Sequence, residues 1–147
     1  MSPSTTQQKW DDRFLDLATH VATWSKDPST KVGAVLVGSS KTQVALGYNG
    51  FPPGLEDSTK RLTDRATRLR YTLHAERNVL DNAAFPTKGA TLYTTHPPCN
   101  LCALSIASKG IRRVVCAPTD PSFASRWAEE TSLSREILRE VDIECNF

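Results

Sequence analysis

The chain has 147 residues, of which 39% are hydrophobic and 23% are charged, as is ordinary for a globular protein with one core. Its net charge of +2 is too small to indicate a surface for long nucleic acids, so such a partner is not expected. Residues 1–8 contain no apolar run suited to a signal peptide, and no later segment approaches the length of a membrane span.

We therefore expect a single domain over residues 1–147, with residues 1–8 flexible and no membrane attachment. The four cysteines comprise one close pair and two isolated residues, which is not the framework of a small disulfide-bonded secreted domain. A cytoplasmic location is expected on these grounds.

Hydrophobic periodicity predicts a helix at the start of the chain, followed by two strands. Large apolar residues recur at steps of three and four, at Trp10, Phe14, Leu17, Val21 and Trp24. Residues 27–30 interrupt this pattern, and residues 32–37 and 44–48 are then typical of strands, the first of them buried. The glycines and prolines of residues 49–54 predict a shaped loop, a place where binding groups often lie.

The second half of the chain alternates between predicted helices and strands. Residues 55–71 are highly charged and predict a solvated helix or loop, unless one or two of their arginines face a phosphate. Helices are then expected from near residue 74 to 83, from about 99 to 108 and over 123–139, and strands over 90–95, 112–117 and 141–145. This alternation predicts an α/β structure in which helices cover a mixed sheet.

Two short segments indicate a metal site. The first is Leu73-His74-Ala75-Glu76, and the second is residues 97–102, with the sequence Pro-Pro-Cys-Asn-Leu-Cys. One His and two Cys can hold a tetrahedral zinc ion with a fourth position open for water, whereas a purely structural site normally uses four protein ligands. Glu76 lies two residues after the proposed ligand, so it can transfer protons without binding the metal. We expect one catalytic zinc ion per chain, with Glu76 as the catalytic residue and three ligands, His74, Cys99 and Cys102.

A redox Cys-x-x-Cys pair and a structural zinc site are the alternatives. A redox motif does not need the His-Ala-Glu segment, and a structural site needs a fourth ligand. The candidates for that ligand are scattered: Cys116 and Cys145 lack close Cys or His partners, His20 lies within a helical pattern, and His96 directly precedes the double proline. His96 has two interpretations, an ordinary residue at the end of a strand or a group that faces the substrate.

These segments resemble the signature of the cytidine and deoxycytidylate deaminase superfamily, His-x-Glu followed by Pro-Cys-x-x-Cys. The resemblance extends from about Trp10 to Val141. Residues 24–35, residues 47–52 and the charged insert before His74 are similar to the deoxycytidylate deaminase branch. The resemblance implies a three-layer α-β-α fold with a mixed sheet of roughly five strands.

The resemblance also implies the reaction, hydrolytic deamination of dCMP to dUMP with release of ammonia, which supplies thymidylate synthesis. Glu76 is then expected to move protons from water to the cytosine ring and to the leaving amino group. Three residues are implied to meet the nucleoside: Ala75 through its backbone N–H to the base carbonyl, Asn49 to the sugar or base, and Val32 against the ring. Phosphate contacts are expected from Lys26, Thr30 and Lys31.

Members of the resembled branch are commonly homo-oligomers, with a hexamer favoured, that dCTP activates and dTTP inhibits. The resemblance implies a contribution of Gly47, Tyr48, Asn49 and Gly50 to that response, and Mg²⁺ could accompany the triphosphate effectors. A bifunctional dCMP/dCTP deaminase is the nearest alternative. A tRNA adenosine deaminase is expected to be more basic, with aromatic positions for an extruded nucleotide, and a free-nucleoside or riboflavin-pathway deaminase is also open. A non-catalytic zinc-stabilised binding module is the last alternative, and the presence of Glu76 argues against it.

Overall fold

Five strands form one mixed sheet in the computed structural model, which describes residues 5–147. Across the sheet they follow the order β2 (Val44–Tyr48), β1 (Gly33–Val37), β3 (Thr91–Thr94), β4 (Arg113–Cys116) and β5 (Glu144–Cys145). β1 runs antiparallel to β2 and β3, whereas β3, β4 and β5 are parallel. Every residue of β1 and β4 is buried, as expected for strands that are covered on both faces.

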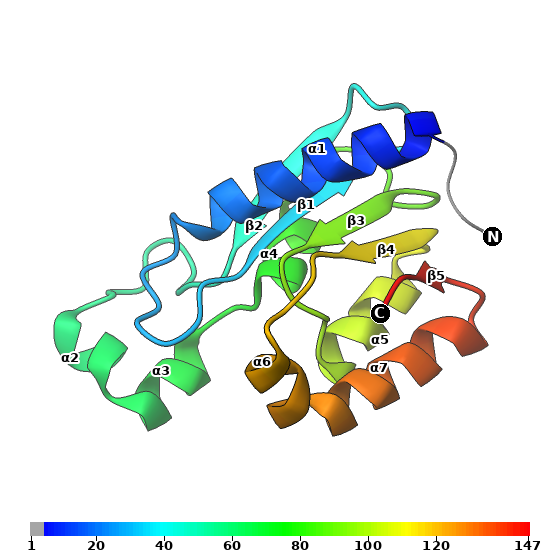
Figure 1. The fold of residues 1–147 in the computed structure, drawn as a ribbon. Helices are drawn as coiled ribbons and strands as arrows, with labels where there is room; N and C mark the ends of the chain where they lie inside the picture. Colours follow the sequence, from blue (N-terminus) through cyan, green and yellow to red (C-terminus); the bar gives the residue numbers. More distant parts are fainter. Residues whose placement is uncertain (1–4) are drawn as a thin grey trace.

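One long helix covers one face of this sheet (Figure 1). α1 (Thr5–Ala22) packs against β1 and β3, and Phe14 and Ala18 share a buried cluster with Val35 and Tyr93. A Cβ atom on Gly33 would lie 2.0 Å from the carbonyl oxygen of Ala18, so only glycine permits the helix to approach this closely.

Three helices cover the other face, α4 (Ala75–Asn82), α5 (Asn100–Ser108) and α7 (Ala128–Glu140). Alternate residues of the strands point to this side, and Leu36 and Leu92 pack with Val79, Ile106 and Leu138 in the larger core cluster. The predicted three-layer α-β-α arrangement with a mixed five-stranded sheet is therefore confirmed. Among the described residues, no helix is long and apolar enough to cross a membrane.

Two helix boundaries differ from the prediction. The first helix begins at Thr5, so residues 5–8, expected to be flexible, form its start, while residues 1–4 lie outside the described residues. The helix expected over residues 123–139 is divided at Trp127 into α6 (Pro121–Arg126) and α7, because Trp127 leaves the helical conformation at φ −110° and ψ 13°. α6 begins where the Asp120 side chain accepts a hydrogen bond from the Phe123 N–H.

The charged segment before His74 folds into two short helices, α2 (Thr59–Thr63) and α3 (Arg65–Tyr71). They lie beyond one end of the sheet, beside the loop that follows α1 (Figure 1). This segment is therefore helical, and of the residues of α2 and α3 only Arg68 is buried.

A buried ion pair joins α1 to the sheet. Nη2 of Arg113, a residue of β4, lies 2.9 Å from Oδ2 of Asp11. The Tyr93 hydroxyl donates a 2.7 Å hydrogen bond to Oδ1 of the same carboxylate. Burial by itself would raise the pKa of Asp11, but the hydrogen bonds from Arg113 and Tyr93 outweigh it and lower that pKa. The folded state thus favours the ionised form of Asp11.

Candidate active site

Three metal-ligating atoms meet at the starts of two helices. His74 is the residue before α4 and Cys99 the residue before α5. Nδ1 of His74 lies 3.5 Å from Sγ of Cys99 and 3.4 Å from Sγ of Cys102, and all three donor atoms lie within 4.8 Å of one another. One nitrogen and two sulfurs at this spacing fit a tetrahedral zinc ion with a fourth position left for another ligand.

The start of α5 favours the thiolate form of Cys99, the form that binds metals. A hydrogen bond from the Cys102 thiol lowers the pKa of Cys99, and the bond to His74 lowers it further. The backbone N–H of Cys102 also donates toward the Cys99 sulfur over 3.5 Å, as the first turn of a helix does for a capping group. The hydrogen bond with Cys99 in turn raises the pKa of His74.

Glu76 is a buried carboxyl beside these donors. It lies in the first turn of α4 and is only 4% exposed. Burial raises the pKa of Glu76, and its carboxyl also interacts with the side chain of Cys102. A buried carboxyl beside the donor cluster is placed to accept and return a proton, which general acid–base chemistry requires.

A cavity of about 400 Å³ opens beside the cluster. His74, Glu76 and Cys99 line part of it. Other parts of the wall come from the loop after α1, from Asn49, from α3, from residues 96–98, and from α6 and the start of α7. This volume is in the range of pockets that enclose a small molecule. The donors and the carboxyl therefore face a space in which a substrate can be held.

The residues predicted to bind substrate fall into two groups. Thr30, Val32, Asn49 and Ala75 line the cavity, whereas Lys26 and Lys31 are absent from its lining. The Nζ atom of Lys26 lies 2.6 Å from a carboxylate oxygen of Asp57 at the surface, and this partner raises the pKa of Lys26.

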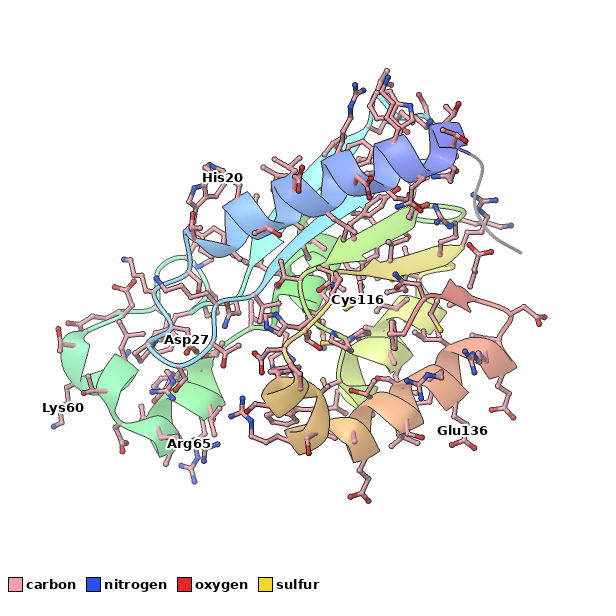
Figure 2. The ribbon with its side chains drawn as sticks, viewed as in Figure 1. His20, Asp27, Lys60, Arg65, Cys116 and Glu136 are labelled. Carbon is pink, nitrogen blue, oxygen red and sulfur yellow. The ribbon has the colours of Figure 1, made fainter. Side chains whose placement is uncertain are left out.

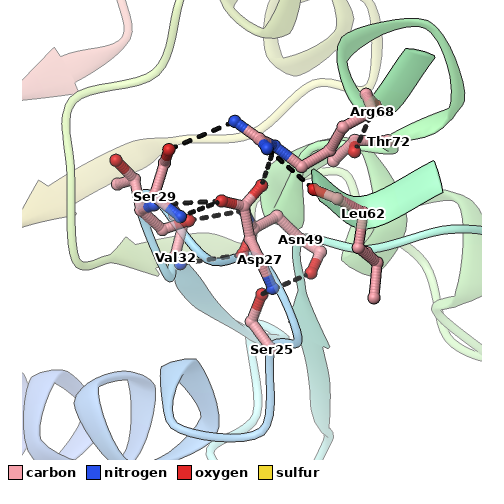
Figure 3. Close-up of polar contacts among 9 residues, drawn as sticks. Ser25, Asp27, Ser29, Val32, Asn49, Leu62, Arg68 and Thr72 are labelled. Carbon is pink, nitrogen blue, oxygen red and sulfur yellow. Dashed lines mark hydrogen bonds and ion pairs between the residues drawn. The ribbon is translucent and has the colours of Figure 1, made fainter. Parts of the chain in front are cut away.

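The amide of Asn49 holds the approach to β1. Its Oδ1 accepts a 2.8 Å hydrogen bond from the Val32 N–H, and its Nδ2 donates to the Thr30 carbonyl oxygen over 2.9 Å (Figure 3). Oδ1 can accept and Nδ2 can donate one more hydrogen bond each, so Asn49 has capacity left for a ligand.

Residues 47–50 connect the end of β2 to the start of the metal-binding helix. Gly50 and Leu73 exchange two backbone hydrogen bonds of 3.1 and 2.8 Å, and the Asn78 side chain donates to the Tyr48 carbonyl oxygen. A Cβ on Gly47 would lie 2.9 Å from the carbonyl oxygen of Ala75, so the strand and α4 touch at this point. Any shift of this loop therefore reaches α4 directly.

The cavity also contains residues that the sequence did not identify. These are two arginines of α3, and residues of α6 and α7: Arg65, Arg68, Phe123, Arg126, Trp127, Glu130 and Thr131. The charge run of residues 55–71 was a visible signal, but it did not indicate which arginines face inward. Arg65 projects from α3 (Figure 2), and no hydrogen bond or ion pair of its side chain is present among the described residues.

His96 belongs to the cavity wall. Its ring lies 4.6 Å from that of Phe123, its Nδ1 is 2.9 Å from the Thr95 hydroxyl, and burial lowers its pKa. His96 therefore lies both just after β3 and at the wall of the cavity, and a contact between its ring and the substrate stays a prediction.

The known proteins that resemble this chain in sequence are deaminases. The family model of the cytidine and deoxycytidylate deaminase zinc-binding region matches residues 8–118. A protein of Aliivibrio fischeri described as an uncharacterized deaminase in the luxG 3' region is 38% identical over 136 residues, which cover 92% of this chain and 91% of that protein. The deoxycytidylate deaminase of Mus musculus is 36% identical over 137 residues, covering 89% of this chain and 75% of the mouse protein.

A solved structure shares the fold over nearly the whole chain. The dCMP deaminase of cyanophage S-TIM5, in complex with dCMP and dUMP, matches 99% of this chain and 98% of its own with a TM-score of 0.75. At 23% sequence identity, this likeness is evidence for the fold alone.

Proposed function

The chain belongs to the cytidine and deoxycytidylate deaminase family, and on that premise we propose that it catalyses the hydrolytic deamination of dCMP to dUMP. Membership confirms the predicted superfamily and its enzymatic, zinc-binding character, so a non-catalytic binding module is set aside. The observation that carries the proposal is the three-donor cluster beside a buried carboxyl at the wall of a 400 Å³ cavity.

We assign the zinc ligands to His74, Cys99 and Cys102. When bound there, zinc supplies Lewis-acid activation of a water molecule. Glu76 accepts a proton from the attacking water, delivers it to ring N3, and then passes the second water proton to the departing amino group. Water and dCMP are thereby converted to dUMP and ammonia, and Glu76 ends in the state in which it began. Its burial supports this role because removal from water disfavours the ionised carboxylate and so raises the pKa of Glu76.

The base is proposed to lie between the start of α4 and the loop before β1. Ala75 is the first residue of α4, so its N–H has no partner inside the helix and can donate to the base carbonyl. Asn49 uses its remaining capacity for the sugar or base, and Val32 packs against the ring. All three residues line the cavity, which supports these roles.

The phosphate has two sets of candidate ligands. Thr30, Lys26 and Lys31 are the set that the sequence predicts. The cavity wall favours Arg65 and Arg126 together with Thr30, because both arginines are among the lining residues while Lys26 is paired with Asp57. Arginine also offers several fixed donors to phosphate oxygens.

Substitution of each cation by methionine separates the two sets. Arg65→Met or Arg126→Met should lower kcat/KM for dCMP by roughly tenfold or more, since a charge-assisted hydrogen bond contributes about 1.5 to 3 kcal/mol. The same variants should leave the low activity on deoxycytidine unchanged. A selective loss for dCMP in Lys26→Met or Lys31→Met instead would assign the phosphate to the lysines.

A panel of substrates tests the proposed function as a whole. Zinc-loaded protein is incubated with dCMP, dCTP, deoxycytidine and a tRNA anticodon stem, and ammonia release is measured with the ultraviolet change from cytosine to uracil. We expect dCMP to have the highest kcat/KM, exceeding deoxycytidine by at least tenfold. Equal efficiency for dCTP would identify a bifunctional enzyme, and exclusive activity on the tRNA or on deoxycytidine would overturn the proposal.

We also propose regulation and assembly as in the resembled branch, with activation by dCTP, inhibition by dTTP, Mg²⁺ bound to these triphosphates, and a homo-hexamer. The hydrogen bonds from residues 47–50 to Leu73 and α4 support a route by which an effector at this loop changes the active site, provided that the effector binds two states with unequal affinity. Saturation curves with each triphosphate and a solution mass test this. Hyperbolic kinetics indifferent to both effectors would leave residues 47–50 with a purely structural role.

A place in thymidylate supply and a cytoplasmic location complete the proposal. The product dUMP is a precursor for thymidylate, and all four cysteines are free thiols, which suits a reducing compartment. Fractionation of the producing cells and the dUMP pool of a strain lacking the protein would test these two points.

A further inference from the structure

Arg68 is a cation buried in the cavity wall. It lies on α3, is 5% exposed, and lines the same cavity as His74 and Glu76. Its Nη1 donates to the Leu62 carbonyl oxygen over 2.8 Å and its Nη2 to the Ser29 hydroxyl over 3.1 Å. Burial of a charge is unfavourable unless it is paired, so these contacts need a compensating anion.

Asp27 supplies that anion from the loop after α1. Its Oδ2 lies 3.6 Å from Nε of Arg68, which has no hydrogen-bond partner among residues 5–147, so charge attraction rather than a hydrogen bond joins the two. Both side chains are largely buried, which strengthens this attraction. Figure 3 shows the guanidinium group above the Asp27 carboxylate, with Ser29 and Leu62 on either side.

Asp27 extends this contact to the residues proposed to meet the substrate. Its Oδ1 accepts hydrogen bonds from the N–H groups of Ser29, at 2.8 Å, and Thr30, at 3.0 Å. The Asn49 amide then links the Thr30 carbonyl oxygen to the Val32 N–H. A continuous series of contacts therefore runs from Arg68 through Asp27 to three residues that line the cavity, Thr30, Asn49 and Val32 (Figure 3).

We propose that Arg68 is a positioning residue, which acts through Asp27 to fix the backbone of residues 27–32 and the Asn49 amide in the geometry that receives the ligand. The planar guanidinium suits this role because it reaches Leu62, Ser29 and Asp27 at once, which a single ammonium cannot do. The identity of the ligand as dCMP rests on the proposed function, whereas the effect on the loop does not.

Hydrogen exchange tests the effect on the loop without any substrate. In Arg68→Met, the amides of Ser29, Thr30 and Val32 should exchange at least about tenfold faster, while those of α1 and β1 keep their wild-type rates. Arg70→Met is the matched control, because Arg70 lies on the same helix but is exposed. If the loop amides keep wild-type rates, or if exchange rises uniformly through the whole protein, Arg68 has no positioning role.

Kinetics test the consequence for the ligand. Arg68→Met should raise KM for dCMP by about tenfold or more and reduce kcat much less, because the wall that it holds does not include the proton-transfer group. Binding of dUMP should weaken by a similar factor at unchanged zinc content. A kcat loss equal to or larger than the KM rise, or unchanged dUMP affinity, would overturn the proposal.

Variants of both partners test whether Arg68 acts through Asp27. Asp27→Asn keeps an oxygen for the Ser29 and Thr30 amides but removes the charge, so Arg68→Met/Asp27→Asn should recover part of the affinity lost in Arg68→Met. Arg68→Lys should fall between wild type and Arg68→Met, and it remains usable if the methionine variant does not fold. Strict additivity of the two substitutions would contradict an action through Asp27. If wild-type protein fails to deaminate dCMP, the proposed function fails, while the exchange experiment still decides the role of Arg68.

Discussion

Replacement of Gly47 by alanine should impair turnover by displacing the helix that carries Glu76. The new Cβ would lie 2.9 Å from the Ala75 carbonyl oxygen and 2.9 Å from both N and Cβ of Val79. Ordinary contacts of this kind begin at 3.4 Å, so β2 and α4 must separate by about 0.5 Å at this point. The backbone atoms of α4 cannot rotate away as a flexible side chain could.

This displacement should lower both the melting temperature and kcat/KM. Overpacking of a close contact costs about 1 to 3 kcal/mol, which lowers the melting temperature of a protein of this length by roughly 2 to 12 °C. Because a shift of about 1 Å at catalytic groups can cost 10²-fold in rate, we expect kcat/KM for dCMP to fall by about tenfold to a hundredfold. Zinc content should fall less than activity, since Cys99 and Cys102 lie at the start of a different helix.

Gly50→Ala is the matched control from the same loop. The nearest atom to a Cβ on Gly50 is 4.0 Å away, on the ring of Tyr48, so this substitution should leave both melting temperature and kcat/KM near those of wild type. Calorimetry, metal analysis and steady-state kinetics of the two variants decide the matter. Wild-type activity in Gly47→Ala, or equal losses in both variants, would refute the packing explanation.

Two further predictions concern the metal ligands and the buried ion pair. Cys99→Ser and Cys102→Ser should each lower zinc content together with turnover, because serine does not supply a thiolate; full zinc occupancy by metal analysis would remove that residue from the ligand set. Asp11→Asn should destabilise the protein by roughly 3 kcal/mol near neutral pH, since it leaves the buried guanidinium of Arg113 without its main partner. The folded-state pKa of Asp11 is lowered, so its contribution is present above the unfolded value of about 3.9 and is lost as pH falls through the lower folded value. Urea unfolding should therefore show the difference between wild type and variant shrinking below about pH 4, and a difference independent of pH would contradict this reasoning.

The sequence predicted the layers well where hydrophobic periodicity is strong. The strands around Val35, Leu92 and Val114 lie where the apolar runs predict them, and α4 and α5 begin beside the two halves of the metal motif. The early start of α1 was missed because residues 5–9 are polar and carry no periodic signal. The division at Trp127 was missed because Phe123 and Trp127 are four residues apart, as in a helix, and no glycine or proline marks the break.

Site residues that lie close together in the sequence could be predicted, whereas those brought together only by folding could not. His74, Glu76, Cys99 and Cys102 are recognisable from spacing within two short segments, and the structure brings them together at two helix starts. Arg68 is different, because α3 carries charged residues on several sides and only contacts with Asp27 and Leu62 distinguish the buried one. The same limit applies to Lys26, whose pairing with Asp57 depends on two loops that are distant in sequence.

The role of Glu76 in deamination is tested by the rate of dUMP formation from dCMP in wild type and Glu76→Gln at equal zinc content. Glutamine keeps the shape of the side chain but cannot accept the proton of water, and loss of a positioned proton-transfer group costs on the order of 10² to 10⁴ in rate. We predict that wild type forms dUMP and ammonia in equal amounts and that the folded, zinc-loaded variant is slower by such a factor. Near-normal turnover of the variant, or no dUMP from the zinc-loaded wild type, would contradict the account.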